Sequence, residues 1–304
     1  MAQKILVLPD AGLVNPFQTQ LIGFLRENGC NVVVAPSGRF FATLRAYLKY
    51  RPDVVYFDWV QSFVLGKTWA ATLLKCFCFW IEILYLAKIE RIPMLHTLHN
   101  MRNHSGLWRK TENTIYRFFL TNCEWIRVYS DTTRTKCARY FGIDKSKIVV
   151  IQDVPFHYCY PNRVSRSEGR VHVGVDQKSF VYLFFGMIKP YKGIEHLIDT
   201  FEKLHDTPSA WLVIAGVGDD PEYEAAIKRR INNIRKIVFV NRFVPIEQTQ
   251  YFFKAADAVV LPFKSIEHSG SIELAMSFGK AVITRRTLST EELLSRQRHL
   301  LFTE

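Results

Sequence analysis

One stretch of the sequence, FFGMIKPYKGIEHLIDTFEKL at residues 184–204, predicts a strand, a glycine turn, a basic loop and an amphipathic helix in direct succession. Residues 181–185 are apolar and rich in β-branched or aromatic side chains, and Gly186 ends this run. Apolar residues then recur at helical spacing, at Ile194, Leu197, Ile198, Phe201 and Leu204. This order is typical of a βα unit in a parallel sheet, and it favours an α/β fold for the chain.

The loop of this unit carries two lysines, Lys189 and Lys192, immediately before the predicted helix. A helix N-terminus presents unpaired N–H groups and the positive end of the helix dipole, so two lysines beside it could bind an anion of the size of a diphosphate. The alternative is a solvated basic loop on an ordinary βα crossover. The residues of the loop alone leave both interpretations open.

The same stretch resembles the start of the C-terminal domain in GT-B glycosyltransferases of the group 1 (family 4) type, in which a strand runs into a G-x-x-x-x-x-K-G-x-x-x-L-I-x-x-F pattern. The residues at the positions of this pattern are Gly186, Lys192, Gly193, Leu197, Ile198 and Phe201. The resemblance implies that Lys192 binds the diphosphate of a nucleotide-sugar. The family's second basic residue follows the glycine directly, where this chain has Met187, and Lys189 is the candidate substitute.

Composition and charge fit an enzyme with an anionic substrate. The chain has 304 residues, of which 48% are hydrophobic and 14% aromatic, enough for one large or two ordinary domains with full cores. The formal net charge of +12 favours a nucleotide-sugar or an anionic membrane as partner. The basic residues are scattered among aromatics and form no nucleic-acid-binding tail, so we expect no nucleic acid. The six cysteines lack disulfide or metal-ligand spacing, and we expect reduced thiols in a cytoplasmic protein.

The chain opens with a buried-type strand at residues 4–9, a loop, a helix that ends at Gly29 and a second strand. This order is the start of a doubly wound, Rossmann-like domain. The loop lies at the carboxyl end of the sheet, where such folds bind ligands, and it carries Asp10, Gly12 and Asn15. In GT-B enzymes this loop borders the acceptor site, which makes the three residues acceptor-side candidates. Their alternative role is plain turn chemistry.

Two further candidates follow strands of this first domain. Asp58 closes the predicted strand at residues 54–57, and it could act as a base toward an acceptor hydroxyl or merely cap the next helix. His99 ends a short strand that begins at Met94. By resemblance to the family, His99 contacts the donor sugar or assists proton transfer, and the alternative is a buried histidine with satisfied hydrogen bonds.

The segment at residues 67–93 is the most apolar part of the chain. Between Thr68 and Ile89 only Lys75, Glu82 and Lys88 are charged, an interruption every six or seven residues that argues against a membrane-spanning helix. Two interpretations remain, a core helix packed on the sheet or a helix that lies in the interface of an anionic bilayer. Basic residues nearby, including Lys67, Lys88, Arg91, Arg102, Arg109 and Lys110, favour the second.

A second chemical stretch, KSIEHSGSIELAMSFGKAVI, begins at Lys264. It is similar to the segment with which the family clamps its nucleotide-sugar. Ser269, Gly270 and Ser271 open a helix whose N–H groups can meet a phosphate, and Glu267 just before them could bind ribose or sugar hydroxyls. The alternative for these serines is a simple N-cap.

Retaining members of the family carry two glutamates with seven residues between them in this stretch. Their positions are occupied here by Ile266 and Leu274, while Glu267 and Glu273 each lie one position away. The pattern therefore leaves open whether the anomeric configuration is retained or inverted. It also leaves Glu273 open as an exposed helical residue.

The resemblance spans nearly the whole chain and implies a GT-B fold, two Rossmann-like domains with parallel sheets facing across a cleft. We predict an acceptor-side domain at residues 1–158 and a nucleotide-sugar-binding domain at residues 159–304, with the junction in the polar stretch at 155–178. The sequence ends at Glu304, where family members usually continue into a C-terminal helix pair that crosses back onto the first domain, so we expect either a trimmed chain or one in which these closing helices are absent.

We therefore predict a glycosyltransferase that moves a sugar from a UDP- or GDP-sugar donor to a glycan or lipid-linked acceptor, in polysaccharide or glycoconjugate synthesis. Its catalytic candidates are His99, Asp58 and Glu267. No D-x-D pair that would hold a metal is evident near the predicted cleft, which agrees with the metal-independent catalysis that the resemblance implies, and we expect no cofactor. We expect a peripheral location on the inner face of the cell membrane. The alternative is a GT-B-fold scaffold or partner subunit without catalytic activity.

Overall fold

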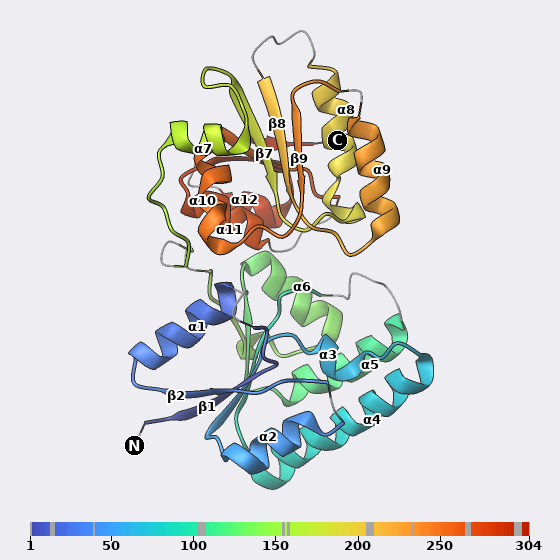
Figure 1. Cartoon of the computed structure of the whole chain (residues 1–304). Helices are drawn as coiled ribbons and strands as arrows, with labels where there is room; N and C mark the ends of the chain where they lie inside the picture. Colours follow the sequence, from blue (N-terminus) through green and yellow to red (C-terminus); the bar gives the residue numbers. More distant parts are fainter. Residues whose placement is uncertain are drawn as a thin grey trace. The chain divides into compact units, whose positions relative to one another are not determined.

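The computed structural model forms two compact units, residues Met1–Asp153 and Val154–Glu304, each built around a parallel sheet (Figure 1). We describe each unit by itself. The residues that the structure describes are 2–12, 16–38, 40–101, 108–153, 156, 159–204, 210–232, 234–264, 269–294 and 300–303. The division after Asp153 lies five residues before the junction at 158 that we predict from the sequence.

The N-terminal unit contains, in its described part, a six-stranded sheet of order β2-β1-β3-β4-β5-β6 in which all neighbours are parallel. Its strands are β1 (Lys4–Leu8), β2 (Asn31–Val34), β3 (Val54–Phe57), β4 (Met94–Thr97), β5 (Trp125–Val128) and β6 (Ile148–Val150). The chain leaves β1 for β2 on one side and then returns to place β3 on the other. The carboxyl ends of β1 and β3 therefore form the topological switch point, where open α/β sheets bind ligands.

Helices cover both faces of this sheet. They are α1 (Pro16–Glu27), α2 (Ala42–Tyr50), α3 (Gln61–Val64), α4 (Trp69–Leu84), the π-helix η1 (Tyr85–Glu90), α5 (Arg109–Asn122), α6 (Asp131–Phe141) and the 3₁₀ turn η2 (Lys145–Lys147). The larger core joins the sheet to α2, α4, α5 and α6, and a smaller core lies under α1. The strands are buried on both faces, which explains their continuous apolar sequences.

The buried carboxyl group of Glu82 joins α4 to α2. The first residue before α2 has no side chain that caps the helix, and the Leu44 N–H instead donates to Glu82 Oε1 at 2.8 Å. Glu82 is 2% exposed, and burial raises its pKa to about 7 against the opposing effect of the helix N–H groups. Glu82, a charged residue of the apolar segment, is therefore structural: from α4 it caps the N-terminus of the neighbouring helix α2.

The C-terminal unit contains, among its described residues, a second six-stranded parallel sheet of order β12-β11-β10-β7-β8-β9. Its strands are β7 (Phe180–Phe185), β8 (Ala210–Gly216), β9 (Ile237–Asn241), β10 (Ala258–Leu261), β11 (Ala281–Arg285) and β12 (Leu300–Phe302). Its helices are α7 (Arg166–Val173), η3 (Pro190–Lys192), α8 (Ile194–Glu202), α9 (Pro221–Ile231), α10 (Ile246–Ala255), α11 (Gly270–Ser277) and α12 (Leu288–Leu294). The switch point of this sheet lies between β7 and β10.

Helix α7 corrects one sequence-based expectation. The polar stretch at residues 155–178 is predicted from the sequence as the junction between domains, yet α7 forms within it and packs on α10. Ser165 and Glu168 make a reciprocal capping box at its start, and Gly174 ends it in a left-handed conformation. The fully buried Arg170 then binds Asp257 at 2.7 Å, which anchors the helix beside β10.

Candidate functional site

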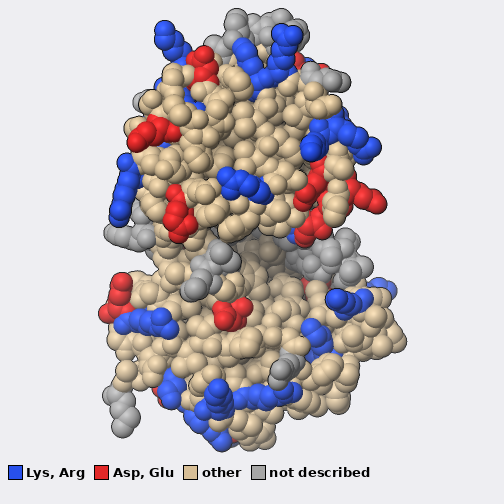
Figure 2. Space-filling view, in the orientation of Figure 1, with Lys and Arg blue, Asp and Glu red and all other residues tan. Residues whose placement is uncertain are grey.

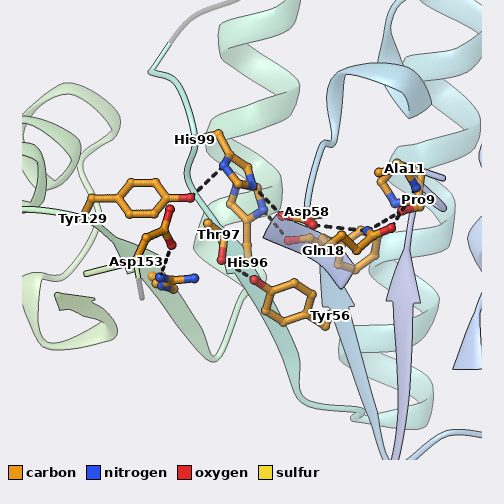
Figure 3. A network of polar contacts seen from close by, with 12 residues as sticks. Pro9, Ala11, Gln18, Tyr56, Asp58, His96, Thr97, His99, Tyr129 and Asp153 are labelled. Atoms are coloured by element: carbon orange, nitrogen blue, oxygen red, sulfur yellow. Dashed lines mark hydrogen bonds and ion pairs between the residues drawn. The ribbon is translucent and has the colours of Figure 1, made fainter. Parts of the chain in front are cut away.

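Asp58 and His99 form a hydrogen-bonded pair at the switch point of the N-terminal sheet (Figure 3). Asp58 directly follows β3 and is 1% exposed, and His99 lies two residues after β4. The His99 Nε2–H donates to Asp58 Oδ1 at 2.5 Å. The structure thus brings together two residues that the sequence singles out separately, and Asp58 binds a side chain rather than capping a helix.

The second ring nitrogen of His99 bonds Tyr129, which follows β5. The Tyr129 hydroxyl lies 2.7 Å from His99 Nδ1. Burial, assisted by the charge of Asp153, raises the pKa of Tyr129 well above its ordinary value, so the hydroxyl keeps its proton and donates it to Nδ1. A neutral His99 therefore carries its proton on Nε2 and offers the basic lone pair at Nδ1.

Gln18 holds the other oxygen of Asp58. Its Nε2 donates to Asp58 Oδ2 at 3.2 Å and to the Pro9 carbonyl at 2.9 Å, while its Oε1 accepts from the Ala11 N–H at 2.8 Å. Gln18 is 2% exposed and joins β1 to β3 across the switch point. The sequence does not single out Gln18, because a polar residue in the first turn of an amphipathic helix carries no local signal of this role.

Aromatic rings fix the orientation of His99. Trp59 stacks on the imidazole with a centroid separation of 4.4 Å and an interplanar angle of 10°, and Phe17 meets it edge-on at 4.9 Å. The Arg127 guanidinium lies over the rings of Phe17 and Tyr129, at 5.3 and 5.1 Å from their centroids. The ring of His99 is therefore held by stacking as well as by two hydrogen bonds.

The other histidine of this strand, His96, has a structural environment. Its Nδ1 bonds the Phe57 carbonyl at 3.0 Å and its Nε2 bonds the Tyr116 hydroxyl at 2.6 Å. Burial lowers the pKa of His96 to about 3, so the ring stays neutral. Two histidines three residues apart thus have different roles, and only His99 adjoins a carboxylate.

The acceptor-side candidates have turn geometry where the structure describes them. Asp10 is exposed, and its Oδ1 accepts a hydrogen bond from the Gly12 N–H at 2.9 Å. Gly12 has a φ of 75°, which favours glycine. The third candidate, Asn15, lies outside the described residues. The loop therefore has the local Asx-turn chemistry that we give as its alternative role.

Two glycines bring the β7 turn close to its neighbours in the C-terminal unit. Gly186 has a φ of 139°, and a Cβ added there would lie 3.0 Å from the Ser271 hydroxyl in the first turn of α11. Gly193, with a φ of 71°, packs so closely on the Pro262 carbonyl that a Cβ would lie only 2.1 Å from the oxygen. The loops after β7 and β10, which the sequence marks separately, thus meet at the switch point.

Lys192 is a buried cation in this corner. Its side chain is 8% exposed, its Nζ lies 4.1 Å from the centroid of the Phe263 ring, and no carboxylate of a described residue pairs with it. Burial, followed by the charge of Lys189, lowers the pKa of Lys192 to about 8. A buried ammonium without a carboxylate partner is costly, and an anion placed beside it would remove that cost.

Lys189, the candidate substitute for the family's second basic residue, has a partner. Its Nζ forms an ion pair with Asp219 at 2.9 Å on a more open surface. This pairing lowers the pKa of Asp219. Lys189 would have to exchange Asp219 for a phosphate in order to bind a donor, whereas Lys192 needs no such exchange.

The start of α11 has the geometry of an N-cap. Ser269 is the N-cap residue, and its hydroxyl accepts from the Ser271 N–H at 3.3 Å. A Cβ at Gly270 would meet nothing within 4 Å, so this position is open. Glu273 is 2% exposed, which corrects the suggestion that it is an exposed helical residue. Glu267 lies outside the described residues, so its role stays a prediction.

Comparison with known proteins supports a common family for both units. The family model described as "Glycosyl transferases group 1" matches residues 165–301, and the model for "Glycosyltransferase Family 4" matches residues 33–153. A GDP-mannose:glycolipid 4-beta-D-mannosyltransferase of Xanthomonas campestris pv. campestris is 27% identical over 278 residues, which is 90% of this chain and 70% of that protein. An uncharacterized glycosyltransferase of Methanocaldococcus jannaschii is 27% identical over 222 residues, 70% of this chain and 56% of that protein.

Solved structures show the same architecture. Anabaena HepE in complex with UDP and glucose superposes with a TM-score of 0.71 at 16% identity, over 100% of this chain and 86% of that chain. Sucrose-phosphate synthase from Thermosynechococcus elongatus superposes with a TM-score of 0.72, also at 16% identity and with the same coverage. At this identity the likeness shows the fold, which confirms the GT-B class.

Proposed function

Because the chain belongs to the group 1 glycosyltransferases, we propose that it transfers a sugar from a nucleotide-diphosphate donor to a hydroxyl group of a glycan or lipid-linked acceptor. The observation that carries the proposal is Lys192, a buried cation at the switch point of the C-terminal sheet that has no carboxylate partner among the residues that the structure describes. A diphosphate is an anion that would match it, and the start of α11, which the turn at Gly186 approaches, would add N–H donors.

In the proposed reaction, the bond between the anomeric carbon and the diphosphate oxygen breaks, and its electron pair leaves with the nucleotide. Lys192 and the N-terminus of α11 stabilise the negative charge on that leaving group, which is the largest catalytic effect we expect. The acceptor oxygen forms the new bond to the anomeric carbon and loses its proton. The reaction as written needs no redox partner.

The N-terminal unit supplies the base in this proposal. The acceptor hydroxyl takes the place of the Tyr129 hydroxyl at His99 Nδ1, and His99 accepts the proton as the bond forms. Asp58 holds Nε2–H and stabilises the resulting imidazolium, as a buried carboxylate does for a histidine base. Gln18 keeps Asp58 in place through its second oxygen.

The relatives named above suggest which substrates to try first. The Xanthomonas protein is named for GDP-mannose as donor and a glycolipid as acceptor, and HepE was solved with UDP and glucose. We therefore propose GDP-mannose as the first donor to test, with UDP-glucose as its competitor. A lipid-linked acceptor would place the protein peripherally at the cytoplasmic face of a membrane.

Calorimetric titration of the full chain with GDP and with UDP tests the donor site. We expect one nucleotide to bind with a dissociation constant in the micromolar range, since a diphosphate forms charge-assisted hydrogen bonds with a buried ammonium. AMP serves as the control ligand, because it has a base and ribose but only one phosphate. If neither diphosphate binds more tightly than AMP, the donor site fails and the scaffold alternative becomes the better account.

A further inference from the structure

The solvent-facing side of α4 is entirely uncharged over its whole length. Its exposed residues are Trp69, Ala70, Leu73, Leu74, Phe77 and Trp80. Their larger side chains are substantially exposed, with fractions of 55% for Trp69 and 58% for Phe77. Residues at this spacing lie on one face of a helix, so they form a continuous apolar strip, which we call the α4 face.

The opposite side of α4 is committed to the core and cannot leave it. Phe79 and Thr72 are 1% and 0% exposed, and the Glu82 carboxyl group caps α2. The Lys75 ammonium donates to the carbonyls of Ser62 and Leu65, both at 2.9 Å. By length and composition residues 69–90 could cross a membrane, but 39% of the most apolar part of this segment is buried inside the unit. The helix therefore lies flat on the unit.

Basic residues border the α4 face, whereas its acidic neighbours are turned away. The exposed basic residues are Lys67 before the helix, Lys88 and Arg91 after it, Arg51 next to Glu90 and Lys110 at the start of α5. Glu82 and Glu112 are buried, and Glu90 binds the hydroxyls of Tyr47 and Tyr85. In Figure 2 the lower right flank of the N-terminal unit is tan, with blue groups around it.

We propose that the α4 face inserts into the headgroup and acyl boundary of an anionic bilayer. The apolar side chains would enter this boundary. The two tryptophans suit the interface, because each combines a large apolar ring with an N–H donor. The bordering lysines and arginines would attract anionic headgroups. The helix lies in the membrane plane, as expected for an amphipathic helix with one face in the protein core.

A second copy of the chain is the less suitable occupant. A twofold interface would place each basic border against its own equivalent, which is repulsive. The exposed residues of this sixteen-residue helix are also far fewer than the roughly 20 to 30 residues per side, or about 800 Å² per partner, that are typical of a stable interface. Anionic lipid satisfies both the apolar strip and the positive charge.

The test is flotation of the full chain with vesicles of phosphatidylglycerol and phosphatidylcholine in equal parts. We expect the wild type to bind these vesicles, to bind pure phosphatidylcholine weakly and to be released by high salt. Phe77→Glu should weaken binding at least about tenfold, because it places a charge in the apolar strip. Leu74→Glu, which leaves the Phe77–Trp80 ring contact intact, should act in the same direction.

Phe24→Glu is the matched control. Phe24 is 61% exposed on α1, outside the α4 face, so the same substitution there should leave vesicle binding unchanged. Equal binding by the Phe77 and Phe24 variants, or no binding by the wild type, would overturn the inference. The inference would also be overturned if the wild type formed a dimer that bound no vesicles, and if Phe77→Glu converted that dimer to monomers. The flotation assay needs no nucleotide-sugar donor. If Phe77→Glu loses vesicle binding but still binds the nucleotide, the membrane contact and the proposed donor site are tested independently.

Discussion

Replacing Lys192 with methionine is expected to remove most nucleotide affinity and, at the same time, to stabilise the free protein. The affinity should fall roughly tenfold to a hundredfold, as for the loss of a charged hydrogen bond worth about 1.5–3 kcal/mol. Methionine keeps a flexible apolar side chain beside Phe263 but brings no buried charge. Calorimetric titration and chemical unfolding of the same two proteins measure both effects.

The gain in stability follows from the lowered pKa of Lys192. A folded-state pKa of about 8, against an ordinary value of 10.5, means that folding opposes the charged form. Below pH 8 the folded and unfolded chains are both protonated, and the full cost, roughly 3 kcal/mol, is present. As the pH rises from 8 to 10.5 the wild type recovers stability, so the advantage of the methionine variant should shrink over that range.

Nucleotide binding should show the complementary pH dependence. The diphosphate favours the charged ammonium, so wild-type affinity should be greatest below pH 8 and weaken as the pH rises through 8. Lys203→Met, an exposed lysine at the end of α8, is the control and should change neither stability nor affinity. A Lys192→Met protein that is less stable and still binds the nucleotide would show that Lys192 is structural.

Replacing Asp58 with asparagine should lower turnover by about 10²- to 10⁴-fold, with little change in nucleotide affinity. The amide can place its oxygen toward His99 or toward Gln18, but not toward both, whereas the carboxylate accepts from each of them. If the amide nitrogen faces His99, it favours the tautomer with its proton on Nδ1, which cannot act as the base. Sugar transfer rates and GDP or UDP titrations separate the two effects.

Asp53→Asn is the matched control for this substitution. Asp53 precedes the same strand at its other end, is exposed, and accepts from the Lys4 N–H at 2.7 Å. It should retain wild-type turnover. If Asp58→Asn unfolds, Tyr129→Phe tests the same network, because it removes the hydroxyl at Nδ1 and keeps the ring. Unchanged turnover of a folded Asp58→Asn protein, or an unchanged pH profile of Tyr129→Phe where Asp58→Asn unfolds, would exclude the Asp58–His99 pair from proton transfer.

The sequence predicts the fold well because local patterns determine it. Apolar strands, turn glycines and amphipathic helices alternate, and parallel βα units follow from that order. Helix α7 is the exception, since its short, polar sequence lacks periodicity and its burial comes from Arg170 and Asp257 far along the chain. Only its capping residues, Ser165 and Glu168, carried a local signal.

The candidate site was predictable in its positions but not in its contacts. Asp58, His99, Gly186 and Lys192 all follow strands or turns at switch points, which sequence order reveals. Gln18 lies 40 positions before its partner Asp58, and Tyr129 lies 30 positions after its partner His99, so no local pattern encodes these contacts.

The same limit applied to the apolar segment at residues 67–93. Its sequence is compatible with a core helix and with an interfacial helix. The structure gives α4 one buried face, which fits the core helix, and one exposed apolar face, on which the proposal of membrane contact rests. The deciding information is which residues the sheet covers, and that depends on tertiary packing.

The most direct test of the central claim is turnover of labelled GDP-mannose and UDP-glucose by the purified full chain, with an extracted glycolipid fraction as acceptor. We expect release of the nucleoside diphosphate from one donor, with the labelled sugar recovered in the lipid fraction. Transfer should be lost with Lys192→Met and Asp58→Asn. A folded wild-type protein that binds either nucleotide yet transfers no sugar from either donor, and releases none to water, would contradict the proposed reaction.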